Sequence, residues 1–588
     1  MSVPAIEIFR VDRPVPTVSA TALADVAVVS GAPESLLGVL EQRLVDARQP
    51  VVLAGDQDGS LGVPEAAGPR IVTDGLRRRE LNIGRMRDNV GQTLTADEQT
   101  RLGRKRDDLL PFSAAGHQTV AAYQGIRSVD ASTSASFADS IGATDPSALP
   151  FAALDGDPQT AWRSDPYEPG AGQWLEVALD TPRRVTEVTV DFADDLRVAA
   201  PVELVRITTD QGVVDRTVPA TAGAHKLETL PGLTTTIRVT VLALRPGYEG
   251  GVALRALGIP GLDAQRGLRV PADVTATDPT PIYAFDRATQ QRGACFQGAD
   301  GVRCDQFLAR TGEEPLGIDR FFATPVDATY DLRLTARPRP GGALPVTRRV
   351  TATSSTVLTG DVTVGAYAAV DGDPATIWLA EPTDTSPTLR LSWTGQRTLD
   401  RLRLVTPATT PAARPARVVL RTPTAELAAD VGADGWVRFP AQRTDRIEVA
   451  VTRSDPVIAD IRGSGWPAPV GVAEVEVPAL TGLLTPATGS TPVYARCGSG
   501  PAVELDGVSY PTTVSGTLAD VRAGRPLKVG VCDDFAAESV PLTAGEHRLR
   551  TVPSAAFVVD SAALVRDGAA TAPAVHSRTV EIGRWDPT

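Results

Sequence analysis

The stretch Asp155-Gly156-Asp157-Pro158-Gln159-Thr160-Ala161-Trp162 returns later in the chain as Asp371-Gly372-Asp373-Pro374-Ala375-Thr376-Ile377-Trp378. The residues before each copy agree as well, because Ala131-Ser132-Thr133-Ser134 precedes the first copy and Ala352-Thr353-Ser354-Ser355 precedes the second. A pattern that returns together with its surroundings indicates duplication rather than chance. We therefore expect two modules of the same fold.

Short segments in which apolar and polar residues alternate follow each copy of the motif. Examples are Val185–Val190 and Val202–Ile207 after the first copy, and Leu399–Leu404 after the second. They are rich in β-branched or aliphatic residues and are bounded by Pro, Gly and Asp, which is typical of antiparallel strands. The sequence predicts a mainly β protein with two β-sandwiches.

The repeated motif also has the chemistry of a cation site. Two carboxylates flank a Gly, and a Thr hydroxyl follows three residues after the second carboxylate. Ca²⁺ prefers such oxygen ligands, namely carboxylates, carbonyls and hydroxyls. The alternative is a purely structural turn, because Asp and Gly favour tight turns for local hydrogen bonding and positive φ.

The motif, the strand that carries a further Trp, and the closing strand Val472–Val477 resemble the discoidin family, also called coagulation factor 5/8 type C. This family has a galactose-binding-like fold that also serves in carbohydrate-binding modules. The resemblance implies a structural Ca²⁺ held by the Asp-Gly-Asp turn, the Thr and a Glu of the closing strand. The second module offers the whole set, and the first module has Ala256 in place of the Glu. The implied ligands are Asp371, Asp373, Thr376 and Glu474 in the second module, and Asp155, Asp157 and Thr160 in the first.

Three aromatic residues lie in Gly- and Pro-rich loops, and we predict that they bind carbohydrate: Tyr167, Tyr248 and Trp466. An exposed aromatic ring can stack on the apolar face of a sugar ring. The alternative is a loop aromatic that folds back onto the sandwich. Four other tryptophans lie in strand contexts and are predicted to be core residues: Trp162, Trp174, Trp378 and Trp393.

The cysteines predict the compartment. Four cysteines allow three pairings, of which we favour Cys295 with Cys304 and Cys497 with Cys532. Two disulfides imply an oxidising environment, and the spacing does not fit a zinc site. The opening residues have no leader pattern and no apolar run is long enough to span a membrane, so the chain is either cytosolic or part of something longer. The disulfides favour the second option.

The 588 residues carry a net charge of −13, which argues against nucleic acid as a partner. We predict a small α/β domain over 1–128, because a helical pattern over Pro33–Arg48 lies between two strand-like runs. Discoidin-like sandwiches follow at 129–262 and 350–480, and β-rich segments at 263–349 and 481–588. The last two segments are either separate tails or two halves of one sandwich that contains the second module as an insertion.

One zone is basic, and its role stays open between a contact with anionic lipid or phosphate and a solvated surface paired with acidic neighbours. Its members are Arg77, Arg78, Arg79, Arg85, Arg87, Arg101, Arg104, Lys105 and Arg106. Signatures of catalysis are missing from the sequence: it has no GxSxG and no HExxH pattern.

The order of the parts is similar to the soluble C-terminal region of the mycobacterial membrane α-(1→3)-arabinofuranosyltransferases. The resemblance implies that a membrane catalytic domain, which uses decaprenyl-phosphoryl-arabinofuranose, is missing from this chain. It also implies a periplasmic region that binds cell-wall polysaccharide, arabinan or a related glycan, without performing the transfer. Two alternatives remain: a secreted lectin or adhesin, and a glycoside hydrolase with appended binding modules.

Overall fold

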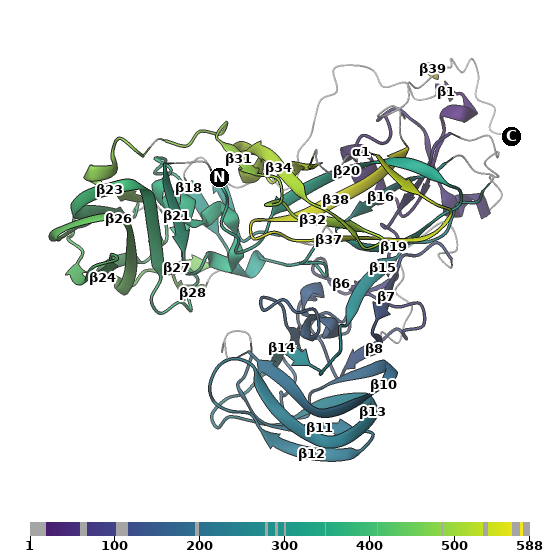
Figure 1. Ribbon diagram of the computed structural model, residues 1–588, viewed down its shortest axis with the longest axis horizontal. Helices are drawn as coiled ribbons and strands as arrows, with labels where there is room; N and C mark the ends of the chain where they lie inside the picture. Colours follow the sequence, from purple (N-terminus) through teal and green to yellow (C-terminus); the bar gives the residue numbers. More distant parts are fainter. Residues whose placement is uncertain are drawn as a thin grey trace.

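The structure is a computed structural model that describes residues 19–58, 68–101, 116–193, 199–276, 280–287, 292–298, 301–346, 349–407, 410–461, 464–484, 486–532, 539–566 and 577–579. The predicted mainly β class is confirmed. Three β-rich bodies are visible in Figure 1: one with β10–β13 at the bottom, one with β23–β26 at the left, and a central body at the upper right.

The first module contains a seven-stranded sheet in the order β12-β11-β13-β10-β14-β9, with β8 also paired to β10. Its longest strands bend at irregularities such as the register shift between Ala178 and Arg183 of β10, so that one strand serves both faces of the sandwich. The strands are β8 Ile126–Ala131, β9 Trp162–Arg163, β10 Trp174–Phe192, β11 Val202–Thr209, β12 Gly212–Thr217, β13 His225–Leu244 and β14 Ala253–Gly258.

The second module has the same pairing order, β21-β23-β26-β24-β25, with β30 paired to β23. Trp378 pairs with Val472 as Trp162 pairs with Leu254, which supports duplication strand by strand. Its strands are β21 Val350–Ser354, β22 Trp378–Leu379, β23 Thr388–Val405, β24 Arg414–Arg421, β25 Glu426–Asp430, β26 Trp436–Asp455, β27 Ile458–Ile461, β28 Ser464–Pro467, β29 Gly471–Val472 and β30 Glu474–Glu476.

Three of the four tryptophans predicted to be core residues are buried, namely Trp162, Trp378 and Trp393. The prediction for Trp174 is wrong. Its ring is only half-buried, and the Arg238 guanidinium lies 4.2 Å from the ring centroid. The strand position was read correctly, but the pleat turns Trp174 to the outer face, where an arginine covers it.

The segments 263–349 and 481–588 together build one central sandwich. One sheet has the order β33-β32-β37-β19-β15-β7, and a ten-stranded sheet has the order β3-β2-β4-β16-β38-β20-β35-β34-β31, with β36 on β20. Apolar rings from both segments meet in its core, including Tyr283, Phe322 and Phe557. Of the two arrangements that the sequence leaves open, the structure therefore has the single sandwich with the second module as an insertion.

The first module is an insertion as well. It lies between β7 and β15, which pair directly with each other in the central sandwich. The strands of the two central sheets after the N-terminal part are β7 Val120–Gln124, β15 Gln265–Arg269, β16 Ile282–Asp286, β19 Asp319–Thr324, β20 Ala328–Pro338, β31 Pro492–Ala495, β32 Ala502–Leu505, β33 Val508–Tyr510, β34 Thr512–Thr517, β35 Leu527–Val531, β36 Ser539–Leu542, β37 Gly545–Val552 and β38 Phe557–Arg566.

The strands of the predicted β-α-β unit do not make a sheet of their own. The predicted β-α-β unit forms, as β2 Ala27–Ser30, α1 Ser35–Glu41 and β3 Val51–Leu53. However, β4 Arg70–Thr73 pairs in parallel with both β2 and β16, which joins the unit to the central sheet and covers a sheet edge. The helix is also shorter than predicted, because Arg43 takes a left-handed φ of 55° directly after its C-cap.

The remaining elements are short. The strands are β1 Ser19–Thr21, β5 Arg79–Leu81, β6 Val90–Thr93, β17 Cys295–Gly298, β18 Gly301–Cys304 and β39 Ser577–Thr579, and the second α-helix is α2 Leu518–Arg522. The 3-10 helices are η1 Leu23–Asp25, η2 Ala54–Asp58, η3 Pro146–Ala148, η4 Pro150–Ala153, η5 Gln306–Leu308, η6 Leu358–Gly360, η7 Val362–Val364, η8 Ala366–Val370 and η9 Pro478–Leu480.

Both disulfides have the predicted pairing. Cys295–Cys304 closes the β17–β18 hairpin, and Cys497–Cys532 joins the segment after β31 to the end of β35. The second bond closes the longer loop, with a sequence separation of 35 residues against 9. Crosslinks of this kind restrict the unfolded chain and so favour the folded state.

Buried ion pairs join the N-terminal part to the central sandwich. Arg77 Nη1 lies 2.7 Å from Glu314 Oε2 and 3.2 Å from Glu313 Oε1, and Arg77 Nη2 lies 3.2 Å from Asp74 Oδ2. Arg320 contacts both Glu314 and Asp74, and Arg266 lies 2.8 Å from Glu313. These neighbouring guanidinium groups hold the pKa of Glu313 and of Glu314 below their usual range. We call this group the ion cluster; its members are Asp74, Arg77, Arg266, Glu313, Glu314 and Arg320.

The basic zone therefore does not act as one surface. Arg77 is buried in the ion cluster, whereas Arg78 donates to the carbonyl oxygens of Thr95 and Glu98. Arg104, Lys105 and Arg106 lie outside the described residues.

Replacing Arg77 with Met should destabilise the protein strongly. The change leaves Glu313 and Glu314 with one cation fewer in a buried site, and breaking a buried ion pair in this way costs about 3–5 kcal/mol. Chemical denaturation measures the loss. The matched control is Arg48→Met, because the Arg48 side chain is exposed and lies 3.7 Å from Asp46 in an exposed ion pair. Equal stability of the two variants would show that the cluster does not hold the fold.

Asp286 should make stability depend on pH. Burial, together with the nearby Asp74 and Asp560 carboxylates, raises the pKa of Asp286 to about 7. The folded state therefore binds this proton more tightly than the unfolded state does, so the contribution is present at low pH and is lost as the pH rises through 7. Asp286→Asn should reduce the fall in Tm between pH 5 and pH 8, and the control Glu34→Gln, an exposed residue, should leave it unchanged. An identical pH dependence in Asp286→Asn would contradict the assignment.

Candidate carbohydrate-binding surface and Asp-Gly-Asp turns

The two Asp-Gly-Asp turns have the same internal hydrogen bonds. The backbone N–H of Asp157 donates to Asp155 Oδ1 at 2.9 Å, and that of Asp373 donates to Asp371 Oδ1 at 2.9 Å. The hydroxyls of Thr160 and Thr376 donate to the first Asp of their turns at 2.8 and 2.9 Å. Gly156 and Gly372 have φ of 74° and 73°, where a side chain would be strained. These hydrogen bonds within the motif help to fix its carboxylates.

The closing strands differ at one ligand position. Trp378 pairs with Val472 and Trp162 with Leu254, so the residue two places further on is Glu474 in the second module and Ala256 in the first. This is the correspondence that the sequence comparison predicts. The first module consequently has no closing-strand carboxylate at this place.

The second turn brings two carboxylates close together, those of Asp371 and Glu474. Glu474 Oε1 is a buried oxygen atom that has no hydrogen-bond partner among the described residues. Burial, and then the Asp371 carboxylate, raises the pKa of Glu474 to about 7, and burial also raises the pKa of Asp371. Two carboxylates that resist ionisation beside each other, with a Thr hydroxyl at hand, are donors that fit Ca²⁺. No group of three or more His, Cys, Asp or Glu side chains among the described residues is arranged to hold a metal as it stands.

The first turn has a weaker donor set. Burial raises the pKa of Asp155 to about 7, but the closing strand offers only Ala256 beside it. A cation here would depend on Asp155, Asp157, Thr160 and backbone carbonyls, which is one charged ligand fewer than in the second turn.

Each turn also receives an arginine from the central sandwich, which the sequence did not predict. Arg522 Nη2 lies 3.0 Å from Asp371 Oδ2, and Arg339 Nη2 lies 3.0 Å from Asp157 Oδ2. Both arginines are more than 150 residues from their carboxylates. Nothing in the local pattern marks them.

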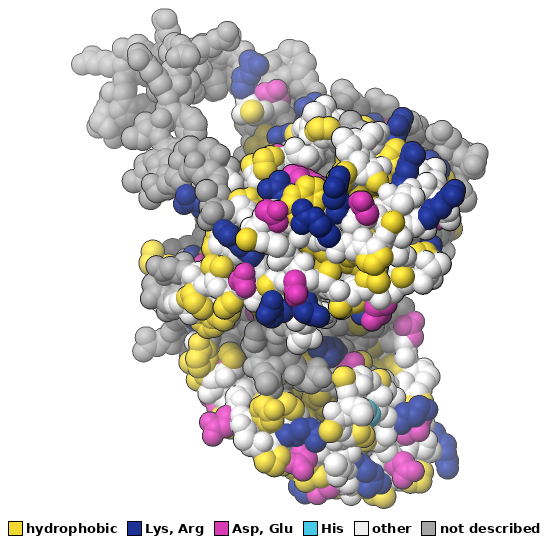
Figure 2. Space-filling view, turned by 90° about the vertical axis from the view of Figure 1, so that its left-hand side faces the viewer, with side chains coloured by type: hydrophobic (Ala, Val, Ile, Leu, Met, Phe, Trp, Pro, Cys, Tyr) yellow, Lys and Arg dark blue, Asp and Glu magenta, His cyan; other side chains and the backbone are white. Residues whose placement is uncertain are grey.

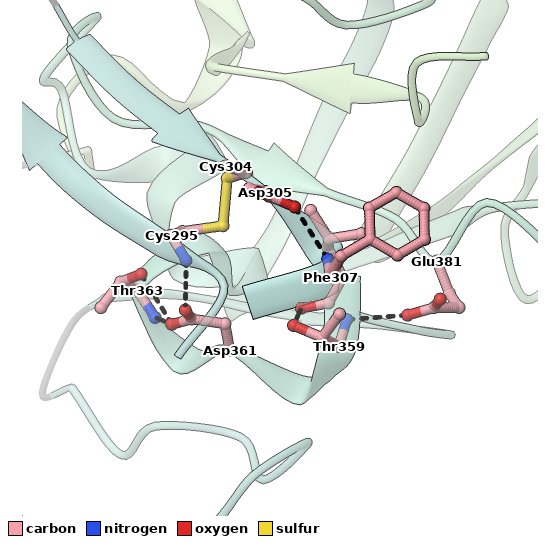
Figure 3. The surroundings of a disulfide bond; sticks show 9 residues. Cys295, Cys304, Asp305, Phe307, Thr359, Asp361, Thr363 and Glu381 are labelled. Carbon is pink, nitrogen blue, oxygen red and sulfur yellow. Dashed lines mark hydrogen bonds between the residues drawn. A yellow bond between two sulfur atoms is a disulfide. The ribbon is translucent and has the colours of Figure 1, made fainter. Parts of the chain in front are cut away.

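Trp466 is an exposed aromatic residue with an aromatic partner. Its exposed fraction is 41%, and its ring lies edge to face with Phe307, with 5.0 Å between centroids. Phe307, itself 37% exposed, comes from η5, directly after the Cys295–Cys304 hairpin, which packs against the second module through Val302. Figure 3 shows Phe307 and Glu381 in the surroundings of this disulfide. Sequence reasoning missed Phe307, because the contact with Trp466 joins segments that are far apart in the chain.

The two tyrosines of the first module lie on neighbouring loops. Tyr167 is 70% exposed and Tyr248 is 42% exposed. The loops touch, since a Cβ added to Gly170 would lie 2.6 Å from the carbonyl oxygen of Gly250. The side chains are therefore available at the surface rather than folded into the sandwich. The structure brings these two candidates to one end of the first module and places Trp466 on the other module.

A polar cavity of about 460 Å³ lies where the first turn, the central sandwich and the second module meet. Its lining contains hydroxyl and charged groups, among them Thr353, Ser355, Arg339 and Glu381. Glu381 accepts a hydrogen bond from the backbone N–H of Thr359 at 2.8 Å. Hydroxyl-rich walls with a few charged groups suit a polyhydroxylated ligand better than an apolar one.

Figure 2 shows that positive and negative side chains are interspersed on the side of the molecule that carries the second module. Arginines and glutamates of β23, β24 and β26 make ladders there, such as Arg390 with Glu448 at 2.8 Å and Arg421 with Glu448 at 2.7 Å. Such exposed pairs keep the surface solvated and add little stability.

Two duplicated sandwiches of the discoidin type, set as insertions on a central β-sandwich and bearing exposed loop aromatics, define a protein with tandem modules of the carbohydrate-binding class. A family model described as "Arabinofuranosyltransferase D, third carbohydrate binding module" matches residues 130–258 and 347–489. A second model, described as "Alpha-(1->3)-arabinofuranosyltransferase, N-terminal GT-C domain", matches residues 1–107.

Curated relatives extend the match to the whole chain. The alpha-(1->3)-arabinofuranosyltransferase of Mycobacterium tuberculosis (strain ATCC 25618 / H37Rv) is 31% identical over 100% of this chain and 43% of its own length. That of Mycolicibacterium smegmatis (strain ATCC 700084 / mc(2)155) is 30% identical over 95% of this chain and 41% of its own length. A cryo-EM structure of arabinofuranosyltransferase AftD from mycobacteria has a TM-score of 0.78 at 24% identity, covering 96% of this chain and 44% of that chain.

The chain is thus related over its whole length to the α-(1→3)-arabinofuranosyltransferases and matches their C-terminal region with carbohydrate-binding modules. It spans less than half the length of the curated relatives that it matches. In the part of the chain that the structure describes, no helix is both long and apolar enough to cross a membrane.

Proposed function

We propose that this chain is the non-catalytic, glycan-binding region of a larger membrane arabinofuranosyltransferase that acts in the assembly of cell-wall arabinan. Its partners are a membrane catalytic domain and a cell-wall polysaccharide, arabinan or a related glycan. Its place is the periplasmic face of the membrane, which the two disulfides support because such bonds persist in oxidising compartments.

The observation that carries this proposal is the exposed pair of Trp466 and Phe307. Two aromatic rings that meet edge to face and remain more than a third exposed have no structural reason to stay in water. Their faces can stack on the apolar faces of sugar rings, and the polar cavity with Glu381 offers groups for the sugar hydroxyls. The match to a carbohydrate-binding module supports the same function.

Contacts of this kind are shallow, so one module alone should bind weakly. The first module adds Tyr167 and Tyr248, and a repetitive polymer can engage both modules at once. Simultaneous engagement raises the retention of a polymer well above the affinity of either site.

We further propose a structural Ca²⁺ in the second module, held by Asp371, Asp373, Thr376 and Glu474. The first module, with Asp155, Asp157 and Thr160 alone, should hold it more weakly. When bound, the ion supplies positive charge that lets the Asp371 and Glu474 carboxylates ionise together. The unpartnered Oε1 of Glu474 supports this assignment.

Trp466→Ala and Phe307→Ala should each reduce retention on immobilised arabinan, as measured by affinity electrophoresis of the full chain. Loss of one of these aromatic rings should reduce the free energy of binding by about 1–3 kcal/mol, because its burial and its stacking on the sugar are lost. Trp436→Ala is the matched control, since Trp436 is a partly exposed tryptophan of the same module that packs near Arg401. Failure of the unaltered chain to bind arabinan or galactan would reject the proposal, and release of reducing ends from either polymer would favour a hydrolase instead.

Calcium should raise the melting temperature of the full chain relative to chelator. An ion that binds only the folded state contributes about 2.7 kcal/mol at a hundredfold excess over its dissociation constant. Glu474→Gln should remove most of this gain. The control Glu476→Gln lies on the same strand, pairs with Arg403 and should keep it. An unchanged melting temperature of the unaltered chain would return the turns to a purely structural role.

A further inference from the structure

The Asp-Gly-Asp turns are also the places where the two modules meet the central sandwich. Arg522, the last residue of α2, donates to Asp371 at 3.0 Å, and Arg339, just after β20, donates to Asp157 at 3.0 Å. Both arginines belong to the central body, and both carboxylates belong to the inserted modules. In both modules the same sequence motif thus attaches the module to the central sandwich.

We call the contact between each turn and the central sandwich a joint. At the second joint, residues on several sides contact the turn. The backbone N–H of Ala487 donates to the carbonyl oxygen of Asp371 at 2.6 Å, and Gly372 lies against Pro486, which a Cβ would meet at 3.1 Å. The helix that carries Arg522 is fixed by a capping box between Thr517 and Asp520. Arg522 is therefore held at the turn rather than reaching it as a free surface side chain.

Arg522 supplies what a buried carboxylate needs. Asp371 has no solvent exposure, and a buried anion is stabilised only by paired charge and hydrogen bonds. The guanidinium gives Asp371 one positive charge and an N–H donor, and it also lies 3.9 Å from Asp373 Oδ2. A divalent cation would give the same carboxylates the same compensation. A guanidinium and a divalent cation that approach the same carboxylate oxygen repel each other.

We propose that Arg522 and a divalent cation compete for the Asp371 carboxylate, so that binding of the cation loosens the attachment of the second module to α2. This inference rests on the proposed calcium site. The first module provides an internal comparison. Arg339 contacts the second Asp of its turn, and Ala256 removes one ligand, so its joint should respond less to the cation than the second joint does.

The test is a calcium titration of the full chain by calorimetry, in the unaltered protein, in Arg522→Gln and in Arg525→Gln. Arg525 is the matched control, because it lies three residues further on, is exposed and forms an ion pair with Asp520 of α2 rather than with the turn. Arg522→Gln should bind Ca²⁺ at least about fivefold more tightly, the lower end of ordinary coupling between linked sites. Arg525→Gln should bind it as the unaltered protein does.

Hydrogen exchange gives a second readout that does not depend on affinity. Calcium should speed exchange in α2 of the unaltered protein, and Arg522→Gln should already exchange fast there in chelator. The strands of both modules should stay protected throughout, which shows that the variant is folded.

The outcomes separate the two proposals. If Arg522→Gln binds calcium with equal or weaker affinity, the competition is overturned but the calcium site is not. The same conclusion follows if calcium does not change the rate of hydrogen exchange in α2. Absence of calcium binding by all three proteins overturns the calcium site and the competition together.

Discussion

The ion cluster is the constraint on which the arrangement of this molecule depends. It brings together three carboxylates and three guanidinium groups from the N-terminal part and from the strands of the central sandwich. A buried pair contributes little net stability compared with apolar packing, but a misplaced partner is costly. The cluster therefore selects one arrangement, in which β4 lies beside β16 and the β2-α1-β3 unit becomes part of the central body. Both modules are inserted into this frame.

The frame also explains how the proposed glycan-binding surfaces can lie far apart and still act together. Each module folds around its own apolar core, and each is joined to the frame at an Asp-Gly-Asp turn by one arginine. Phe307 follows the hairpin that packs on the second module, and it completes an aromatic pair with Trp466 of that module.

Local chemistry made much of this predictable from the sequence. The duplicated turns, the alternating strands and the pairing of four cysteines depend on neighbours in the chain, and the structure has them where the residues indicate. What the sequence could not provide are contacts between distant segments. Arg77 meets Glu313 across 236 residues, and Arg522 meets Asp371 across 151. The sequence around Arg77 and around Arg522 does not differ from the sequence around the many exposed arginines. Trp174 was misjudged for a related reason, because the face of a strand is set by its partners.

The insertion of both modules has a mechanical consequence. The first module leaves and rejoins the frame between the paired strands β7 and β15, and the second leaves after β20 and rejoins before β31. Figure 1 shows β1 and β39, which pair with each other, at the upper right of the molecule. Tension applied between the N-terminal strands and β38 runs through β4, β16 and β38 of one sheet. The modules are attached outside this path, so a polymer that pulls on them acts first on their contacts with the central body, such as the two arginine–aspartate pairs.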